Sequence, residues 1–156
     1  MKATKRPKPF RGLIAVRRSG VHGRGVFARQ DIPRGNRIIE YTGERISWKA
    51  AQALPPTDPD DPHHTFFFSL DDGQVVNAAV DGNEARWINH SCAPNCRTDE
   101  VKGRVYIYAR RKIKAGEELF YDYSLEPADR RTKALEQIFR CDCGSKKCRG
   151  TMLEAK

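Results

Sequence analysis

At 156 residues the chain has the length of one domain and is long enough to bury a hydrophobic core. Its charged fraction of 31% and hydrophobic fraction of 38% are typical of a soluble globular protein, and no apolar run approaches the ~18 residues of a membrane span. The net charge of +9 favours an anionic partner, such as nucleic acid or a nucleoprotein, about as much as a plain solvated basic surface.

The first ten residues form a basic arm that prolines interrupt. Because no apolar stretch follows its lysines and arginine, the arm lacks the pattern of a secretory signal. Such an arm suits sequence-independent contact with phosphates, or is a disordered tail without a function. Five cysteines without that signal favour a reducing, intracellular compartment, the cytoplasm or the nucleus or nucleoid, where thiols bind metal more often than they pair.

Short strands separated by glycine dominate the pattern along the chain. Residue preference and alternation predict strands at residues 13–16, 25–28, 37–41, 66–70, 75–78, 105–109 and 118–121. Asp72-Gly73 lies between two of these strands and predicts a hairpin, and Lys102-Gly103 predicts another turn. Because no long helices separate the strands, the pattern predicts small packed β-sheets and excludes a doubly wound α/β fold.

Helix is expected in two places. Ser47 predicts the N-cap of a short helix that reaches Leu54 and stops at the two following prolines. Residues 128–139 carry apolar side chains at helical spacing between an acidic start and a basic end, which predicts a second helix. The proline- and aspartate-rich residues 55–64 predict a loop, whose two neighbouring histidines fit exposed positions better than metal ligands.

Three cysteines late in the chain have the spacing of a metal site. Cys141 and Cys143 are two positions apart and Cys148 follows five residues later, so three sulfurs gather around one point. A closed structural zinc site needs a fourth ligand, and Cys92 and Cys96 are the remaining candidates. The spacing therefore predicts that the end of the chain folds back onto the Asn-His-Ser segment. A disulfide is the alternative, but two cysteines in a Cys-x-Cys pair point to opposite sides of an extended chain.

Five motifs in order give the chain a specific resemblance. They are GVHGRGVFA (20–28), IIEYTGERIS (38–47), GNEARWINHSCAPNC (82–96), GEELFYDY (116–123) and CDCGSKKCRG (141–150). Together they resemble the SET-domain protein lysine methyltransferases with a post-SET zinc motif, over residues 11–153. The resemblance implies a mainly β fold of small packed sheets with short helices, in which the C-terminal segment threads through a preceding loop as a pseudoknot. It divides the chain into a basic arm (1–10), a SET domain (11–125) and a post-SET helix with a zinc-binding tail (126–156).

The resemblance implies S-adenosylmethionine as the methyl donor. The donor-binding positions that match the family are Arg24, Gly25, Val26, Phe27, Asn89, His90, Met152 and Leu153. The first four would offer backbone groups to the methionine part, where glycine permits close approach. The Asn-His pair would contact the ammonium end and the adenine, and the last two residues would pack on the adenine. Arg86 is either a structural or a donor-contacting arginine.

The implied acceptor is a lysine side chain. Its amine has a pKa of about 10.4, so deprotonation at pH 7 costs roughly 4–5 kcal/mol. A narrow apolar channel lowers that cost because burial disfavours the charged amine, which the sulfonium of the donor also repels. Attack in line with the S–CH₃ bond requires donor and lysine to enter from opposite faces. The protein would then orient, desolvate and deprotonate the amine.

Three tyrosines and two phenylalanines match this channel. Tyr123, the second tyrosine of YDY, matches the catalytic tyrosine, whose hydroxyl orients the amine. Tyr121 matches the position that controls how many methyl groups are added, and a tyrosine there implies mainly mono- or dimethylation. Tyr41, Phe66 and Phe68 would line the channel, since aromatic faces attract an alkylammonium. The family often carries tyrosine at the position of Phe66, so one hydroxyl is absent here.

The resemblance also selects the metal ligands. Cys92, Cys141, Cys143 and Cys148 match the ligands of one structural zinc ion, which leaves Cys96 as a free thiol. Four thiolates around Zn²⁺ leave a net charge of −2. Basic residues beside the cysteines would offset this charge: Arg140, Lys146, Lys147 and Arg149. Without zinc we expect the tail to unfold and the donor affinity to fall.

Three functions remain open from the sequence. The first is methylation of a basic tail, such as a histone or histone-like protein, and the second is methylation of a non-histone protein. The third is a basic zinc-containing module that binds nucleic acid or chromatin with little activity, although the intact Tyr123, Asn89 and His90 argue against it. We expect a monomer that binds a lysine-bearing protein and no membrane. The positive net charge repels a basic tail, and five acidic residues would supply local attraction: Asp58, Asp60, Asp61, Asp71 and Asp72.

Overall fold

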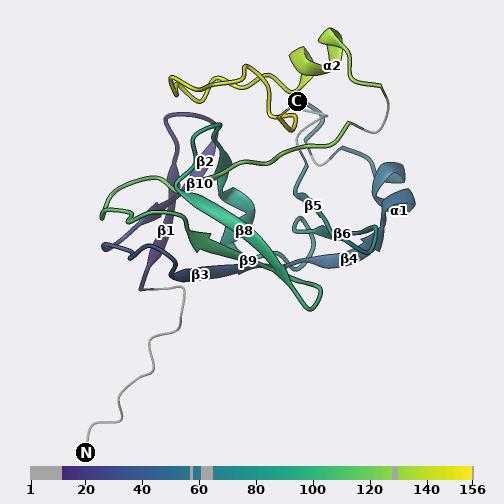
Figure 1. Ribbon diagram of the computed structural model, residues 1–156. Helices are drawn as coiled ribbons and strands as arrows, with labels where there is room; N and C mark the ends of the chain where they lie inside the picture. The colour runs from purple at the N-terminus through teal and green to yellow at the C-terminus, as the bar shows by residue number, and fades with distance from the viewer. Residues whose placement is uncertain (1–11, 57, 61–64, 128–129, 156) are drawn as a thin grey trace, which may run out of the picture.

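The computed structural model of the protein describes residues 12–56, 58–60, 65–127 and 130–155 (Figure 1). The predicted basic arm and the two neighbouring histidines of the 55–64 loop lie outside these ranges. In chain order the elements are β1 (Ile14–Arg18), β2 (Arg24–Ala28), β3 (Arg37–Tyr41), β4 (Glu44–Ser47), α1 (Trp48–Ala53), β5 (Phe67–Ser69), β6 (Gln74–Asn77), the 3-10 helix η1 (Glu84–Trp87), β7 (Asn89–His90), β8 (Cys96–Val101), β9 (Arg104–Ala109), β10 (Phe120–Tyr121) and α2 (Lys133–Ile138). None of the helices in the described ranges is long and apolar enough to cross a membrane.

Four small sheets enclose one core. They are the hairpin β1-β2, the antiparallel sheets β3-β9-β8 and β4-β6-β5, and the parallel pair β10-β7. The core consists of aliphatic side chains from the inner faces of these sheets and the connecting loops, all of them fully buried: Val26, Ile32, Ile39, Ile88, Ile107, Ile113 and Leu119. The predicted fold class, mainly β with short helices, is confirmed.

All seven predicted strands are present, each within two residues of its expected ends. The two predicted turns are confirmed as well. Gly73 adopts a φ of +84° between β5 and β6, while Lys102 (+52°) and Gly103 (+77°) form the tight connection between β8 and β9. The sequence did not predict β4, β7 or β8. Strand β8 alternates buried and exposed residues without an apolar alternation, because its neighbour β9 supplies most of the buried aliphatic surface.

The first helix is confirmed and the second begins later than expected. Ser47 caps α1 by accepting a hydrogen bond from the Ala50 N–H (3.0 Å). Within the described part of residues 128–139, α2 begins only at Lys133, because the Thr132 hydroxyl accepts from the Leu135 N–H (3.1 Å) and fixes the N-terminus there. The prediction that residues 130–132 are helical was therefore wrong.

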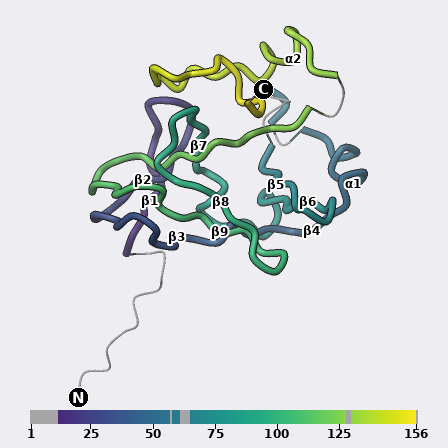
Figure 2. Tube along the Cα trace, in the orientation of Figure 1, coloured from purple at the N-terminus to yellow at the C-terminus, as the bar shows by residue number. Residues whose placement is uncertain are grey.

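The C-terminal tail returns across the molecule to the middle of the chain. Figure 2 shows the tail, yellow, lying beside the segment that follows β10. Leu125 forms a parallel bridge with Leu153, and the bridge is closed by hydrogen bonds from the Leu125 N–H to the Met152 carbonyl (3.1 Å) and from the Glu154 N–H to the Leu125 carbonyl (2.9 Å). The predicted return of the tail is confirmed.

A glycine fixes the approach of η1 to the end of β6. A Cβ on Gly82 would overlap the Ala78 carbonyl oxygen and lie 2.7 Å from its carbon, and neither backbone atom can move freely. We expect Gly82→Ala to lower the free energy of unfolding, measured with urea, by about 1–3 kcal/mol, the usual cost of overpacking. Gly20→Ala is the control, because a Cβ there has nothing within 4 Å. Equal stability of the two variants would contradict this explanation.

Candidate active site

The site is built on the parallel pair β7-β10. Phe120 pairs with Asn89 and Tyr121 with His90, so two segments about thirty residues apart lie side by side. The side chain of Asn95 substitutes for backbone where the pair ends: its amide donates to the Glu118 carbonyl (2.8 Å) and accepts from the Phe120 N–H (2.9 Å). This places the tyrosine-rich end of β10 next to the Asn-His pair of β7.

Tyr123 lies directly after β10 and is held at three points. Its hydroxyl donates to the Ile88 carbonyl (2.5 Å), its backbone N–H donates to His90 Nδ1 (3.0 Å), and its ring lies 4.9 Å from that of Tyr121. Burial, reinforced by the negative charge of Glu118, raises the pKa of Tyr123 well above its ordinary value. The hydroxyl therefore stays protonated at neutral pH, so it can orient a group through its lone pairs but cannot act as a phenolate base.

The predicted aromatic wall is present beside Tyr123. Phe68 bridges Tyr41 (ring centroids 5.4 Å apart) and Tyr121 (6.3 Å), and the Tyr41 hydroxyl donates to the Phe66 carbonyl (2.8 Å). Burial raises the pKa of both Tyr41 and Tyr121, so these hydroxyls are also neutral. The structure thus brings together all five aromatic residues that the sequence assigned to the channel.

Trp87 extends this wall, although the sequence assigned it no role. Its ring meets the Phe66 ring edge-on (5.2 Å, 81°) and lies near the guanidinium groups of Arg24 (5.3 Å) and Arg86 (4.9 Å). Arg86 donates to the Ala78 carbonyl (3.4 Å), and its Nε is buried without a hydrogen-bond partner. The only signal in the sequence was the position of Trp87 within the RWINHSC motif.

His90 has a defined tautomer because both ring nitrogens have partners. The Tyr123 N–H can only donate, so Nδ1 is the acceptor, and Nε2 carries the hydrogen and points to Cys92 Sγ at 3.4 Å. Burial lowers the pKa of His90 to about 4, despite the nearby Asp122 carboxylate, which agrees with a neutral ring. The imidazole of His90 therefore links the backbone of Tyr123 to the cysteine cluster.

Asn89 ties the β1-β2 loop to Glu118. Its amide nitrogen lies 3.0 Å from the His22 carbonyl, 2.9 Å from the Arg24 carbonyl and 3.0 Å from Glu118 Oε2. Ser19 donates to the same carboxylate (2.8 Å), and a Cβ on Gly25 would overlap its oxygen. The carboxylate of Glu118 thus occupies the space that a side chain at position 25 would take. Sequence reasoning missed the role of Glu118 because one glutamate in GEEL carries no distinctive signal.

The other residues predicted to bind the methyl donor lie on β2 and in the tail. Arg24 is exposed, Val26 is fully buried and Phe27 is half-buried on β2. Leu153 is fully buried against the parallel bridge with Leu125, whereas Met152 is half-buried. An open cavity of about 640 Å³ lies beside β1 and β2, and it is lined by Val16, Arg17, Arg18, Gly23 and Arg24.

Four cysteines form a cluster with the geometry of a metal site. The sulfurs of Cys92, Cys141, Cys143 and Cys148 all lie within 4.8 Å of one another, and those of Cys92 and Cys141 are 3.8 Å apart. Four zinc–sulfur bonds of about 2.3 Å at tetrahedral angles place sulfurs about 3.8 Å apart, so the residues fit zinc. All five cysteines are free in the structure, and the cluster favours a metal site over the disulfide alternative.

Cys96 is not part of this cluster. Its side chain points into the core from β8 and is 1% exposed. Burial raises the pKa of Cys96 to about 12, so it stays a protonated thiol. Burial raises the pKa of the Cys143 thiol as well. Hydrogen bonds from the backbone of Cys92 and Ser145 outweigh this effect and lower the pKa to about 6. The fourth cysteine of the cluster is therefore Cys92 and not Cys96.

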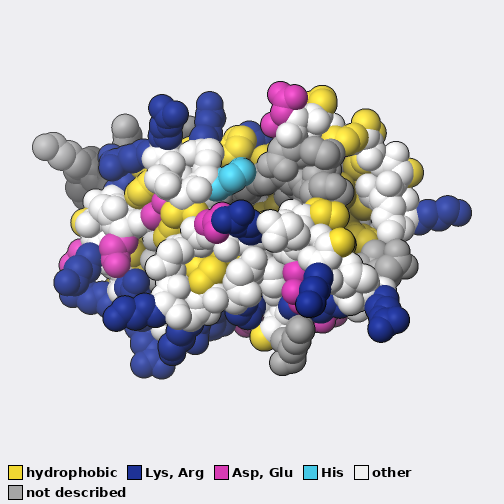
Figure 3. Space-filling model, turned by 90° about the horizontal axis from the view of Figure 1, so that it is seen from above, with side chains coloured by type: hydrophobic (Ala, Val, Ile, Leu, Met, Phe, Trp, Pro, Cys, Tyr) yellow, Lys and Arg dark blue, Asp and Glu magenta, His cyan; other side chains and the backbone are white. Residues whose placement is uncertain are grey.

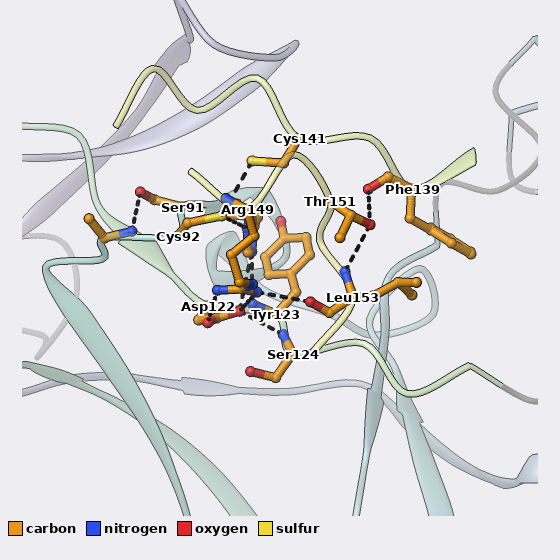
Figure 4. Close-up of polar contacts among 12 residues, drawn as sticks. Ser91, Cys92, Asp122, Tyr123, Ser124, Phe139, Cys141, Arg149, Thr151 and Leu153 are labelled. Carbon is orange, nitrogen blue, oxygen red and sulfur yellow. Dashed lines mark hydrogen bonds and ion pairs between the residues drawn. The ribbon is translucent and has the colours of Figure 1, made fainter. Parts of the chain in front are cut away.

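One of the four predicted charge-balancing residues contacts the cluster. The Arg149 N–H lies 3.4 Å from Cys92 Sγ, and its guanidinium pairs with Asp122 (Figure 4). Arg140 instead pairs with the exposed Asp142 (3.1 Å), and its side chain is 60% exposed. Lys146 and Lys147 are exposed. Among the described residues, no contact of either lysine with the cluster supports the predicted charge balance.

Comparison with known proteins identifies the family. The family model for the SET domain matches residues 23–124. Histone-lysine N-methyltransferase 2B of Homo sapiens is 38% identical over 146 residues, which are 91% of this chain and 5% of that protein. Histone-lysine N-methyltransferase trr of Drosophila melanogaster is 37% identical over 152 residues (95% of this chain, 6% of that protein).

A fungal relative is similar over the same range. The H3 lysine-4 specific histone-lysine N-methyltransferase of Candida albicans is 40% identical over 152 residues, 94% of this chain and 14% of that protein. The chain therefore spans only a small part of the length of these relatives. Because the family model covers more than half of the chain, including β7, β10 and the Asn-His and Tyr-Asp-Tyr segments, the chain belongs to the SET-domain family.

Proposed function

We propose that the chain is a protein-lysine N-methyltransferase that transfers a methyl group from S-adenosylmethionine to lysine on a basic protein tail. One observation carries the proposal: a neutral, half-buried Tyr123 lies at the end of a wall of aromatic side chains, next to the Asn-His pair. The relatives named histone-lysine N-methyltransferase support the reaction type. Because these relatives are far longer than the chain, activity and substrate are proposed here for the domain.

The aromatic wall favours the neutral form of a lysine amine, because it removes the water that stabilises an ammonium. Tyr41, Phe68 and Tyr121 remove water from the alkyl chain, and their faces attract a partly positive or methylated amine. Desolvation lowers the roughly 4–5 kcal/mol cost of deprotonation at pH 7. The neutral Tyr123 hydroxyl then orients the amine lone pair, while S-adenosylmethionine supplies an activated methyl on its sulfonium.

The donor would lie on the other side of Tyr123, against β2 and the tail. Asn89 holds the 22–24 backbone in place, so Arg24 and Gly25 present a preformed edge beside the 640 Å³ cavity. His90, Val26, Phe27, Met152 and Leu153 complete the proposed contacts, with Leu153 acting through its packing. In-line transfer follows, since the lysine enters from the aromatic side.

The four-cysteine cluster supports a structural zinc ion as the second cofactor. Its ligands come from the 89–92 segment and from the tail, so the ion would fasten the proposed post-SET segment (126–156) to the SET domain (11–125). All four positions are protein thiols, which leaves no open position for a substrate. We infer a role in closing the tail and none in the chemistry.

A basic tail such as that of a histone is the proposed substrate, in a reducing compartment of the cell. The relatives' names favour it, one of them naming H3 lysine-4. Lys and Arg side chains gather around the rim of the face in Figure 3, which would repel such a tail, so the acidic loops become important. Asp58, Asp60, Asp71 and Asp72 are exposed, and Asp61 lies outside the described residues. A monomer and phosphate contact by residues 1–10 stay predictions.

The central test measures methyl transfer to a panel of basic proteins. Incubation with S-adenosylmethionine and histones, other basic proteins and peptides should add mass in steps of one methyl group on histone-like tails. Tyr123→Phe should reduce kcat at least about 100-fold with donor affinity retained, because only the orienting hydroxyl is lost. Tyr106→Phe, on β9 under the Arg37 guanidinium, is the matched control and should be fully active.

The outcomes separate the three functions. Equal activity of Tyr123→Phe would refute the catalytic assignment. Donor binding by calorimetry without transfer to any protein would favour the nucleic-acid- or chromatin-binding module. Transfer to non-histone proteins alone would select the remaining alternative.

Tyr121 should set the number of methyl groups. Its side chain is buried and its hydroxyl is neutral, and we propose that this hydroxyl would hold a water beside the amine, which gives mono- and dimethylation as the main products. Tyr121→Phe should shift the products toward trimethyl-lysine with kcat for the first methyl changed less than about fivefold. Mass spectrometry of a peptide product over time measures this ratio. An unchanged ratio would refute the assignment.

Zinc removal should open the tail. We expect about one zinc per chain by elemental analysis, lost in Cys143→Ser and retained in Cys96→Ala, since only the first is in the cluster. Cys143→Ser should lower donor affinity at least about tenfold, because breaking the cluster frees the tail. Zinc loss in Cys96→Ala, or full donor affinity without zinc, would contradict the proposed role.

A further inference from the structure

Arg149 connects the cysteine cluster to the catalytic segment. It directly follows Cys148, and its backbone N–H lies 3.4 Å from Cys92 Sγ. Its guanidinium makes two parallel hydrogen bonds to Asp122, Nη1 to Oδ2 at 2.9 Å and Nη2 to Oδ1 at 3.0 Å (Figure 4). Bidentate pairs of this kind are the strongest and most directional ion pairs in proteins.

Asp122 is itself fixed on the catalytic segment between Tyr121 and Tyr123. Its Oδ1 accepts from the Ser124 N–H (2.9 Å) and lies 3.6 Å from His90 Nδ1. Burial alone would raise the pKa of Asp122, but the hydrogen bonds from Arg149 and Ser124 outweigh it and lower the pKa below its ordinary value. The carboxylate therefore stays charged at neutral pH and available to the arginine.

The same guanidinium also orders the chain that follows it. Arg149 Nη2 donates to the Leu153 carbonyl (2.9 Å), which closes a loop of four residues over the ion pair. Within that loop the Thr151 hydroxyl donates to the Phe139 carbonyl (3.1 Å), and the buried Leu153 packs at its bridge with Leu125. One residue thus joins the cysteine cluster through its backbone N–H, and the catalytic segment and the end of the tail through its side chain.

A second arginine beside the cluster, Arg140, forms an exposed ion pair that can be compared with that of Arg149. Arg140 precedes the ligand Cys141 and pairs with Asp142, but the two side chains are 60% and 72% exposed and lie two residues apart. In the pair of Arg149 and Asp122 the exposed fractions are 22% and 28%, and the partners are 27 residues apart. Exposed local pairs contribute little, whereas shielded pairs between distant segments resist separation.

We propose that Arg149 is a positioning residue, and that its pair with Asp122 is a latch that holds residues 149–154 closed over the donor site. This inference rests on the proposed function for its kinetic consequence. The metal would fix the ligands up to Cys148. The chain beyond that residue is held by the bridge of Leu125 with Leu153 and by hydrogen bonds to the Phe139 carbonyl, and Arg149 adds a charged contact to the catalytic segment. By the same contact the latch sets the position of Asp122, and with it the backbone of Tyr123.

The experiment breaks the latch without touching a cysteine. Arg149→Gln should retain about one zinc per chain, because no ligand changes. Amide exchange at Met152 and Glu154, whose N–H groups donate to Phe139 and Leu125, should accelerate at least about tenfold, the effect of losing one charge-assisted pair. The KM for S-adenosylmethionine should rise about tenfold for the same reason, while kcat at saturating donor falls less than about threefold. Arg140→Gln is the matched control and should leave the zinc content, the exchange rates, KM and kcat unchanged.

A rescue and a cycle distinguish the latch from general damage. Arg149→Lys keeps the charge but not the two parallel bonds, so its exchange rates and KM should lie between those of the parent and Arg149→Gln. Asp122→Asn should accelerate the same amides, and the double variant with Arg149→Gln should be no worse than either single one.

Three results would overturn the latch. They are zinc loss in Arg149→Gln, unchanged exchange at Met152 and Glu154, or equal effects of Arg149→Gln and Arg140→Gln. Exchange is measured without donor or substrate, so it tests the latch even if the parent protein methylates nothing. In that event only the proposed function would fail.

Discussion

Two residues of parallel strand on each side, Asn89-His90 and Phe120-Tyr121, hold this site together. So short a pair has little stability of its own, and side chains supply what the ladder lacks. Asn95 bonds β10 through both ends of its amide, and the His90 imidazole accepts the N–H of Tyr123. These groups are buried, so each lost bond would leave an unsatisfied polar group and cost about 1–3 kcal/mol. These bonds give the pair a single arrangement, which positions Tyr121 within it and Tyr123 directly after it.

Burial keeps the tyrosines and the histidine around this pair neutral. Tyr41, Tyr121 and Tyr123 are neutral because their pKa values are raised by desolvation, and His90 is neutral because its pKa is lowered by the same cause. The charges that remain are compensated, as in the pair of Asp122 with Arg149. An environment that disfavours charge on tyrosine and histidine also disfavours it on a lysine amine. The proposed chemistry needs such a surrounding, since an ammonium has no lone pair with which to attack a methyl group.

Residue types with strong local rules were predictable, and residues whose role depends on a distant partner were not. Ser47 and the prolines after Leu54 defined α1, and Asp72-Gly73 defined a hairpin, because capping and turn chemistry act within four residues. Strand β8 was missed since its polar residues become a strand only beside β9. The Cys-x-Cys spacing predicted the return of the tail, but the choice of Cys92 over Cys96 needed the resemblance, and only the fold shows Cys96 in the core. Glu118 and Arg149 were undervalued for the same reason, as their partners lie 29 and 27 residues away.

Besides its bridge with Leu125, the tail has the cysteine cluster and the Arg149 pair as attachments, and these two are adjacent in sequence. Thiolates around a metal would fix Cys141, Cys143 and Cys148 in position, and among the described residues Cys92 and His90 connect them to the catalytic segment. Arg149 adds a direct connection one residue after the last ligand, so an ordered cluster delivers its guanidinium to Asp122 with little further loss of chain entropy. A disordered cluster would leave that arginine on a free chain, where the same pair would have to offset the ordering of several residues. The two attachments would therefore be cooperative: a bound metal would make the ion pair favourable, and the ion pair would transmit closure of the tail to the tyrosines.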